Sequence, residues 1–213
     1  MRGLLRNNFY AMYANAKVFS VIMIGVGIFV VAMDNEIHSL IIGYMVSAIV
    51  GFSLNSVASV RNESASKWIK HKLAAPVRRA DIVKSLYLSQ LIWLLAGAAF
   101  AGCVVVFSVL LHGYPFDKTT DIFMIFVVGI SVSLFMGATF FPLFFLGGEE
   151  RSDVFLMISL ACGIGMLMGL STVINIIFPG YMTQVQIIGS GSAILACGGL
   201  AFVLSYLFVR KRF

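Results

Sequence analysis

The sequence predicts an all-α, polytopic membrane protein that crosses the bilayer six times. Of its 213 residues, 60% are hydrophobic and 11% are charged, and the mean hydropathy is +0.99. The 56 residues between Asp153 and Arg210 include no Asp, Glu, Lys or Arg. A water-soluble domain cannot leave so long a segment uncharged, because its helices need a solvated face. Since a spanning helix needs about 20 apolar residues, this run holds two spans, separated at Pro179-Gly180.

Four shorter uncharged runs supply the other spans. The first has 16 residues, or about 24 Å at 1.5 Å per residue, so we expect residues 14–16 to extend it while Lys17 reaches the headgroups. No remaining stretch is large enough for a further domain, so residues 1–213 are expected to form a single transmembrane domain. The six spans are predicted near residues 18–33, 38–58, 86–111, 122–146, 154–178 and 185–209.

Residues 1–17 precede the first span and are predicted to form an amphipathic helix that lies in the membrane interface. The alternative is a mildly amphipathic juxtamembrane tail. A cleavable signal peptide would also begin with basic and then apolar residues, but residues 31–35 lack the small-x-small cleavage pattern and five spans follow. The predicted apolar face of this helix consists of Leu4, Leu5, Phe9, Met12, Tyr13 and Ala16.

The placement of basic residues predicts the orientation. With six spans, 14 of the 15 Lys and Arg residues fall on the side of the two termini, and only Lys118 falls on the other. Because cytoplasmic loops carry the excess of basic residues, both termini are expected in the cytoplasm. The net charge of +6 therefore reflects membrane topology and anionic lipid headgroups, and it does not indicate nucleic-acid binding.

Several kinds of chemistry are missing from the sequence. No Asp, Glu, Lys, Arg or His sits at the centre of a span, whereas ion-coupled carriers usually keep such a residue there; sodium sites built from neutral oxygens leave that class open. Cys103, Cys162 and Cys197 lack metal-ligand spacing and are interpreted as small packing residues. Neither a metalloprotease motif nor a phosphate-binding loop is present, so we expect no cofactor in this chain.

Small residues recur at every fourth position in three spans. Such rows allow helix backbones to approach closely where lipid supplies no hydrophobic drive, so they predict helix contacts. The rows are Gly129, Ser133 and Gly137; Gly165 and Gly169; and Gly189, Ala193, Cys197, Ala201 and Ser205.

The longest polar stretch covers residues 59–84. Its first part suits a short helix, which Pro76 would end, and Asp81 marks a new helix start. Glu63 followed by Leu73-Ala-Ala-Pro-Val-Arg-Arg-Ala-Asp-Ile-Val-Lys84 resembles a pattern of small ABC-2-type permeases. Residues 3–10, Gly-Leu-Leu-Arg-Asn-Asn-Phe-Tyr, are similar to the opening of that family, and Pro142–Arg151 resembles its motif after the fourth span. Ala75 and Arg79 depart from the usual residues of the first pattern.

This resemblance implies a permease dimer, of identical or different chains, with two cytoplasmic ATPases that bind ATP and Mg²⁺. It places a coupling helix at about Ser64–Leu73. Trp68 and Ile69 would enter a groove on the ATPase. The basic residues Lys67, Lys70 and Lys72, with Glu63 nearby, would face charged partners around that groove, unless the segment is a lipid-facing basic loop. A second candidate contact is the turn Glu149-Glu150-Arg151, which would otherwise be a solvated turn that caps the next helix.

The sequence most resembles the permeases of bacterial phenol-soluble modulin exporters and of lantibiotic self-protection transporters. We therefore expect export of amphipathic or hydrophobic peptides, such as toxins or antimicrobials, across a bacterial cell membrane. Spans rich in Phe, Met and Ile would suit such substrates. The alternatives are an ion-coupled carrier or channel without an ATPase, and a non-transporting immunity protein that binds a peptide.

Overall fold

The computed structural model describes residues 2–33, 39–65, 79–113, 116, 118–148, 151–178 and 183–212. Within these residues, six helices are long and apolar enough to cross a membrane, as predicted. The chain is therefore all-α and polytopic. The helices are α1 (Arg2–Met33), α2 (Ser39–Ala65), α4 (Arg79–His112), α5 (Thr119–Gly147), α6 (Ser152–Ile177) and α7 (Gln184–Arg212).

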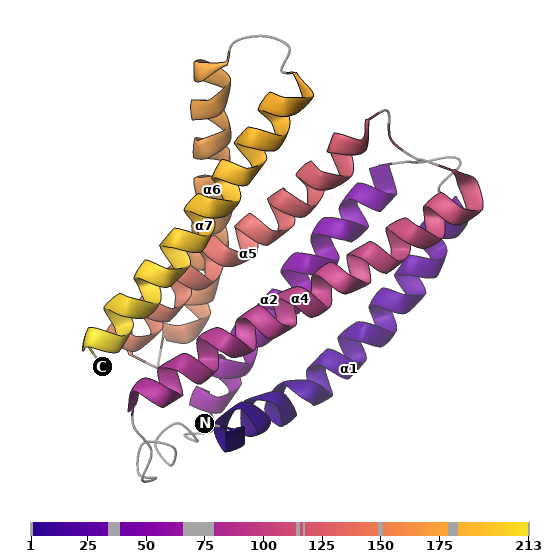
Figure 1. Cartoon of the computed structure of the whole chain (residues 1–213). Helices are drawn as coiled ribbons and strands as arrows, with labels where there is room; N and C mark the ends of the chain where they lie inside the picture. Colours follow the sequence, from indigo (N-terminus) through magenta and orange to yellow (C-terminus); the bar gives the residue numbers. More distant parts are fainter. Residues whose placement is uncertain are drawn as a thin grey trace.

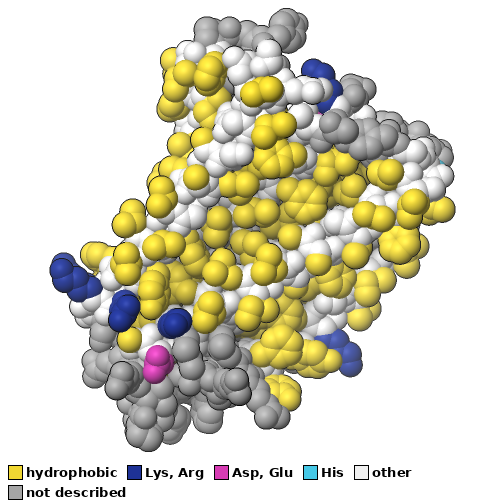
Figure 2. All heavy atoms as spheres, viewed as in Figure 1, with side chains coloured by type: hydrophobic (Ala, Val, Ile, Leu, Met, Phe, Trp, Pro, Cys, Tyr) yellow, Lys and Arg dark blue, Asp and Glu magenta, His cyan; other side chains and the backbone are white. Residues whose placement is uncertain are grey.

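Successive helices run in opposite directions, so both termini lie at the same end of the bundle (Figure 1). We call this end the termini end and the other the opposite end. Hydrophobic side chains cover the middle of the face shown in Figure 2, and most of its Lys and Arg side chains lie toward the termini end. This distribution suits a lipid-facing belt between two polar layers. The cytoplasmic location of the termini stays a prediction.

The helices form two groups, and α2 joins them. In one group α1 and α4 pack against α2, and in the other α6 and α7 pack against α5; α2 also lies along α5 (Figure 1). In the most apolar parts of α2 and α5, 50% of the residues are buried, compared with 11% for α6. Helices α2 and α5 therefore form the centre of the bundle, and α6 lies at its edge.

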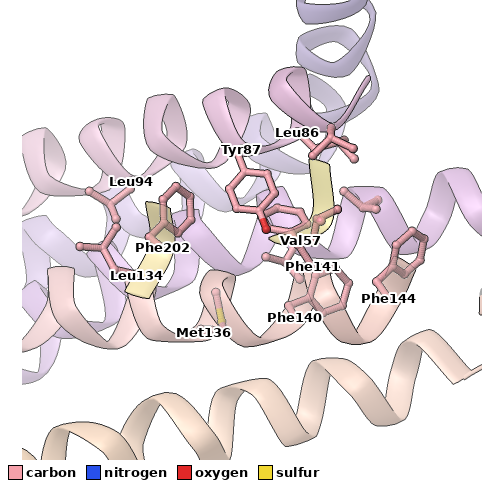
Figure 3. Close-up of a cluster of buried hydrophobic side chains, with 13 residues drawn as sticks. Val57, Leu86, Tyr87, Leu94, Leu134, Met136, Phe140, Phe141, Phe144 and Phe202 are labelled. Atoms are coloured by element: carbon pink, nitrogen blue, oxygen red, sulfur yellow. The ribbon is translucent and has the colours of Figure 1, made fainter. Parts of the chain in front are cut away.

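An aromatic core fills the termini end (Figure 3). The rings of Tyr87 and Phe141 lie 4.3 Å apart between centroids, and Phe202 meets Tyr87 edge-on at 5.0 Å. The hydroxyl groups of Tyr87 and Ser205 share a hydrogen bond of 2.7 Å, which satisfies both in an apolar setting. This core joins α2, α4, α5 and α7. Its other members include Val57, Val60, Val83, Leu86, Leu94, Met136, Phe140, Phe144 and Val209.

The predicted small-residue row on α5 is confirmed, because Gly129, Ser133 and Gly137 are all buried. The row on α6 makes no contact within the described part of the chain, since no described residue lies within 4 Å of where a Cβ on Gly165 or Gly169 would be. The row on α7 is mostly wrong. The buried positions of that helix are Gly191, Ile194, Gly198, Phe202, Ser205 and Val209.

The N-terminal segment is helical, but its helix continues through residue 17 without interruption to Met33. Among the side chains of this segment that the structure describes, Asn8, Met12 and Ala16 are buried, and they lie on one row of the helix. The side chains of Leu4 and Leu5 lie outside the described part. Phe9 and Tyr13, expected on the same apolar face, are 43% and 51% exposed. A location in the membrane interface stays a prediction.

Two side-chain hydrogen bonds tie this buried row to α4. Asn8 Nδ2 donates to Ser85 Oγ at 3.2 Å, and Ser89 Oγ donates to Met12 Sδ at 3.3 Å. The start of α1 is thus held against the first turns of α4.

Candidate functional site

Most of the predicted coupling residues lie outside the described part of the chain: Lys67, Trp68, Ile69, Lys70 and Lys72. The backbone of Glu63 lies in the last turn of α2, which extends to Ala65 and so includes the predicted start of the coupling helix at Ser64. Helix α2 ends and α4 begins at the termini end, where the aromatic core lies.

The first turns of α4 are firmly packed. Ile82, Val83, Leu86 and Tyr87 are each at most 7% exposed, although they follow directly on the polar stretch. A displacement of the chain just before Arg79 would therefore act on the aromatic core and not on a solvated helix end.

The second predicted contact is described only in part. Glu149 and Glu150 lie outside the described residues, whereas Arg151 is exposed immediately before α6. Gly148, which follows α5, has a φ of +84°, a conformation that favours glycine. A Cβ on Gly147 would overlap the ring of Phe155, so the end of α5 lies close against α6.

A buried amide lies where the two helix groups meet. Gln90 of α4 is 0% exposed, and its Nε2 donates to the backbone carbonyl of Ser133 on α5 at 2.9 Å and to Ser53 Oγ on α2 at 3.3 Å. A Cβ on Gly137 would overlap this amide. We call the contact of Ser53, Gln90, Ser133 and Gly137 the seam.

Two polar atoms of the seam have no hydrogen-bond partner among the described residues. They are Gln90 Oε1 and Ser133 Oγ, both fully buried. In a soluble protein such a buried unpaired group costs about 1–3 kcal/mol, and a bilayer offers no water to relieve it. The seam is therefore a buried polar contact between the two groups whose hydrogen bonding is incomplete among the described residues.

Gln90 was not predicted as a functional residue, because its amide carries no charge and matches no motif. The available signal was a lone amide within a stretch of 32 residues that contains no charge. A neutral polar residue at membrane depth is expected to find a partner on another helix, and Gln90 finds two.

An apolar groove of about 530 Å³ opens at the opposite end, between α1, α2 and α4. Tyr44 contributes a polar atom to its wall, but the hydroxyl already donates to the carbonyl of Met23 at 3.2 Å. Gly27 allows Tyr44 and Val104 to approach α1 closely, since a Cβ there would lie 3.1 Å from the Tyr44 hydroxyl and 3.0 Å from Val104 Cγ2. The wall is formed by Ile24, Gly27, Ile28, Val31, Tyr44, Ala99, Phe100, Cys103, Val104, Phe107 and Leu111.

A second groove, of about 410 Å³, lies at the opposite end between α5, α6 and α7. Ser171 and Thr172 line it together with apolar residues such as Met124 and Met168. The Thr172 hydroxyl donates to the carbonyl of Met168 at 2.9 Å, so it is satisfied within its own helix. Both grooves therefore offer mainly hydrocarbon surfaces.

Within the described residues, no three His, Cys, Asp or Glu side chains gather as a metal site. The three cysteines are free; Cys103 and Cys197 are exposed on the bundle surface and are therefore not interior packing residues, whereas Cys162 is half-buried. The described residues therefore form an aromatic core at the termini end, a buried polar seam and two apolar grooves at the opposite end.

Comparison with known protein families matches residues 3–212 to the family described as ABC-2 family transporter protein. Neither a curated protein nor a solved structure matches the chain. The match covers nearly the whole chain, including all six helices.

Proposed function

The chain belongs to the ABC-2 family of transporter membrane proteins, and on that premise we propose that it is the permease of a peptide exporter. Members of this membrane family lack ATPase activity, so this permease is not itself an ATPase. The observation that carries the proposal is the family match over six membrane-spanning helices.

The proposed energy source is a separate cytoplasmic ATPase that binds ATP and Mg²⁺, since ABC-2 permeases typically pair with one. It would dock at the termini end on the segment Ser64–Leu73 and on the turn before α6. Trp68 and Ile69 would enter a groove on the ATPase, with Lys67, Lys70 and Lys72 around it. The packed start of α4 supports this assignment, because the segment leads directly into buried residues.

The proposed cargo is an amphipathic or hydrophobic peptide. The groove of about 530 Å³ supports this class, because its polar hydroxyl is already paired and its other walls are mainly aliphatic and aromatic. An apolar side chain can enter such a groove without losing hydrogen bonds, whereas a polar one would leave its groups unpaired.

We further propose that the working unit holds two permease subunits, either identical or related. Helix α6 supports this arrangement. Its buried residues are Ser152, Ser159 and Gly163, so most of its length offers an unoccupied surface to another chain.

The double variant Trp68→Ala with Lys70→Glu tests the coupling segment. We expect it to insert into the membrane normally and to lose nucleotide-dependent export, measured with a labelled amphipathic peptide in cells or vesicles that contain the ATPase. Lys118→Glu, a charge reversal at the opposite end, serves as the matched control and should retain export. Normal ATP-dependent export by the double variant would refute the assigned segment.

Reconstitution without an ATPase tests the energy source. The permease alone in vesicles should move no peptide against a gradient. Uphill transport by the isolated chain would instead support an ion-coupled carrier. Peptide binding without nucleotide-dependent export from the complete complex would support an immunity protein.

A further inference from the structure

We propose that Gln90 is a latch between the two helix groups: it holds the seam closed in the arrangement seen here and releases it when the groups separate during transport. The inference rests on the proposed function for the transport cycle, but its structural part concerns this chain alone. Gln90 acts through the position of α5, so it is a positioning residue.

The side-chain amide of Gln90 binds residues of both helix groups. Gln90 belongs to α4, yet it reaches α2 and α5 at once, through Ser53 Oγ at 3.3 Å and the carbonyl of Ser133 at 2.9 Å. The bond to Ser133 crosses from one helix group to the other. Because its acceptor is a backbone atom, the bond fixes the position of the helix α5 and not merely that of a side chain.

Two glycines of α5 make room for side chains of the neighbouring helices around the amide. Gly137 makes room for Gln90, and Gly129 makes room for Ile49 of α2, where a Cβ would lie 2.9 Å from Ile49 Cδ1. At these two positions α5 presents backbone to its neighbours, and the side chains of Ile49 and Gln90 occupy the space that the glycines leave. Two buried hydrogen bonds of α4 thus cross between the groups: that of Tyr87 to the side chain of Ser205 on α7, and that of Gln90 to the backbone of α5.

The hydrogen bonding of the seam is incomplete among the described residues. Gln90 Oε1 and Ser133 Oγ are buried without a partner among the described residues. If the separated groups admit water along a transport pathway, opening the seam would break the bonds of Nε2 but would give both unpaired atoms hydrogen-bond partners. Hydration of Gln90 Oε1 and Ser133 Oγ would offset part of the free energy lost with the two hydrogen bonds of Nε2. The closed seam would therefore persist and still be able to open.

A thiol placed at residue 133 reports the opening. Ser133→Cys preserves the acceptor, because Gln90 binds the carbonyl of this residue and not its hydroxyl. Replacement of Cys103, Cys162 and Cys197 by Ala removes competing thiols. The rate of reaction with a water-soluble methanethiosulfonate reagent is then measured on the permease–ATPase complex in vesicles, without nucleotide and after trapping with ATP and vanadate.

We expect slow labelling without nucleotide and about tenfold faster labelling in the trapped state. Gln90→Met keeps the volume of the side chain but loses both hydrogen bonds, and it should raise the nucleotide-free rate about fivefold, as loss of one or two such bonds predicts. Gly137→Ala, which displaces the amide without changing it, should act in the same direction. Gly165→Ala, which meets nothing within 4 Å, should leave the rate unchanged.

A purely structural role would lower the thermal midpoint of Gln90→Met and leave the labelling rate of the folded protein at that of the parent. That result, or slower labelling in both seam variants, would overturn the latch. If nucleotide has no effect on the parent while both variants label faster, the latch stands and the ATP-driven function fails. If nucleotide accelerates the parent but neither variant differs from it, the latch fails and the function stands.

Discussion

At the termini end, four helices meet around stacked and edge-on rings, whereas at the opposite end the helices enclose two apolar grooves of about 530 and 410 Å³. Helix α6 shows the contrast within one element. Its buried residues lie between Ser152 and Gly163, and the turns that follow are largely exposed.

The difference shows how one bundle can both receive a force and change shape. Closely packed interiors transmit displacement with little compression, whereas regions with few buried contacts rearrange at low cost. The proposed ATPase would dock beside the aromatic core, and the proposed cargo would occupy the grooves at the opposite end, next to a second buried cluster that includes Ile41, Met45 and Ala101. The seam at Gln90 lies between them.

The largest expected effect is on the aromatic core. Phe141→Ala removes a fully buried ring and should destabilise the permease by about 3–5 kcal/mol, because the site cannot collapse around the lost volume. Phe107→Ala, at a ring that is 59% exposed in the larger groove, is the matched control and should cost less than about 1 kcal/mol. Thermal unfolding in detergent measures both. Equal losses would show that the two ends are equally packed.

Two glycines of α6 sharpen the contrast within one helix. A Cβ on Gly163 would lie 3.0 Å from the carbonyl oxygen of Val132, so Gly163→Ala must push α6 away from α5 and should cost about 1–3 kcal/mol. Gly165→Ala meets no neighbour and should be neutral or slightly stabilising, since alanine favours a helix. The same unfolding measurement compares them. A larger loss for Gly165→Ala would place an unseen contact on the exposed part of α6.

Filling the larger groove should impair export with little change in stability. Ala99 is exposed and lines the groove, so Ala99→Phe should reduce export of an amphipathic peptide about tenfold by occupying the space for an apolar side chain. Ala196→Phe, at an exposed position of α7, is the control. Peptide export from vesicles with the ATPase measures both. Full export by Ala99→Phe would exclude this groove as a cargo site.

The smallest expected effect concerns one hydrogen bond of the core. Tyr87→Phe and Ser205→Ala each remove the 2.7 Å bond between these hydroxyl groups, and their coupling in a double-mutant cycle should be about 0.6 kcal/mol, the average for interhelical bonds in a membrane. Unfolding midpoints of the two single variants and the double variant give this value. Additive losses would mean that ring packing alone holds this end together.

Sequence alone predicted the number and approximate position of the helices. A spanning helix needs about 20 residues without charge, and water-soluble helices do not contain uncharged runs of that length. It also located the packing face of α5. That helix has neighbours on several sides, so a row of small residues such as Gly129 and Gly137 necessarily meets one of them.

Where a helix lies at the edge of the bundle, the same reasoning failed. Lipid accepts Gly165 and Gly169 as readily as another helix does, so spacing cannot reveal which small residues touch protein within the chain. The α7 row failed for a related reason: Gly191 and Gly198 are buried, seven residues apart, whereas Gly189 and Cys197 face outward. The position of the neighbouring helices decides which small residues of α7 are buried, and the sequence of α7 alone does not contain that position.

The candidate site was predicted only in part. The family motifs identified the segment between α2 and α4, but the coupling residues from Lys67 to Lys72 lie outside the described structure and their role stays a prediction. Gln90 was missed, because a single amide in a long apolar run has no sequence pattern that reveals its partners. Its role depends on Ser53 and Ser133, which are 37 and 43 residues away.

Helix α1 runs without interruption from its contact with the first turns of α4 to the wall of the larger groove. With 32 residues at 1.5 Å each, the helix is about 48 Å long. Asn8 and Met12 fasten its beginning to α4, and Ile24, Gly27 and Ile28 near its other end belong to the wall of the larger groove. A tilt of about 5° around Met12 would move Gly27, about 22 Å further along the helix, by about 2 Å, so a displacement of α4 reaches the groove through one continuous helix.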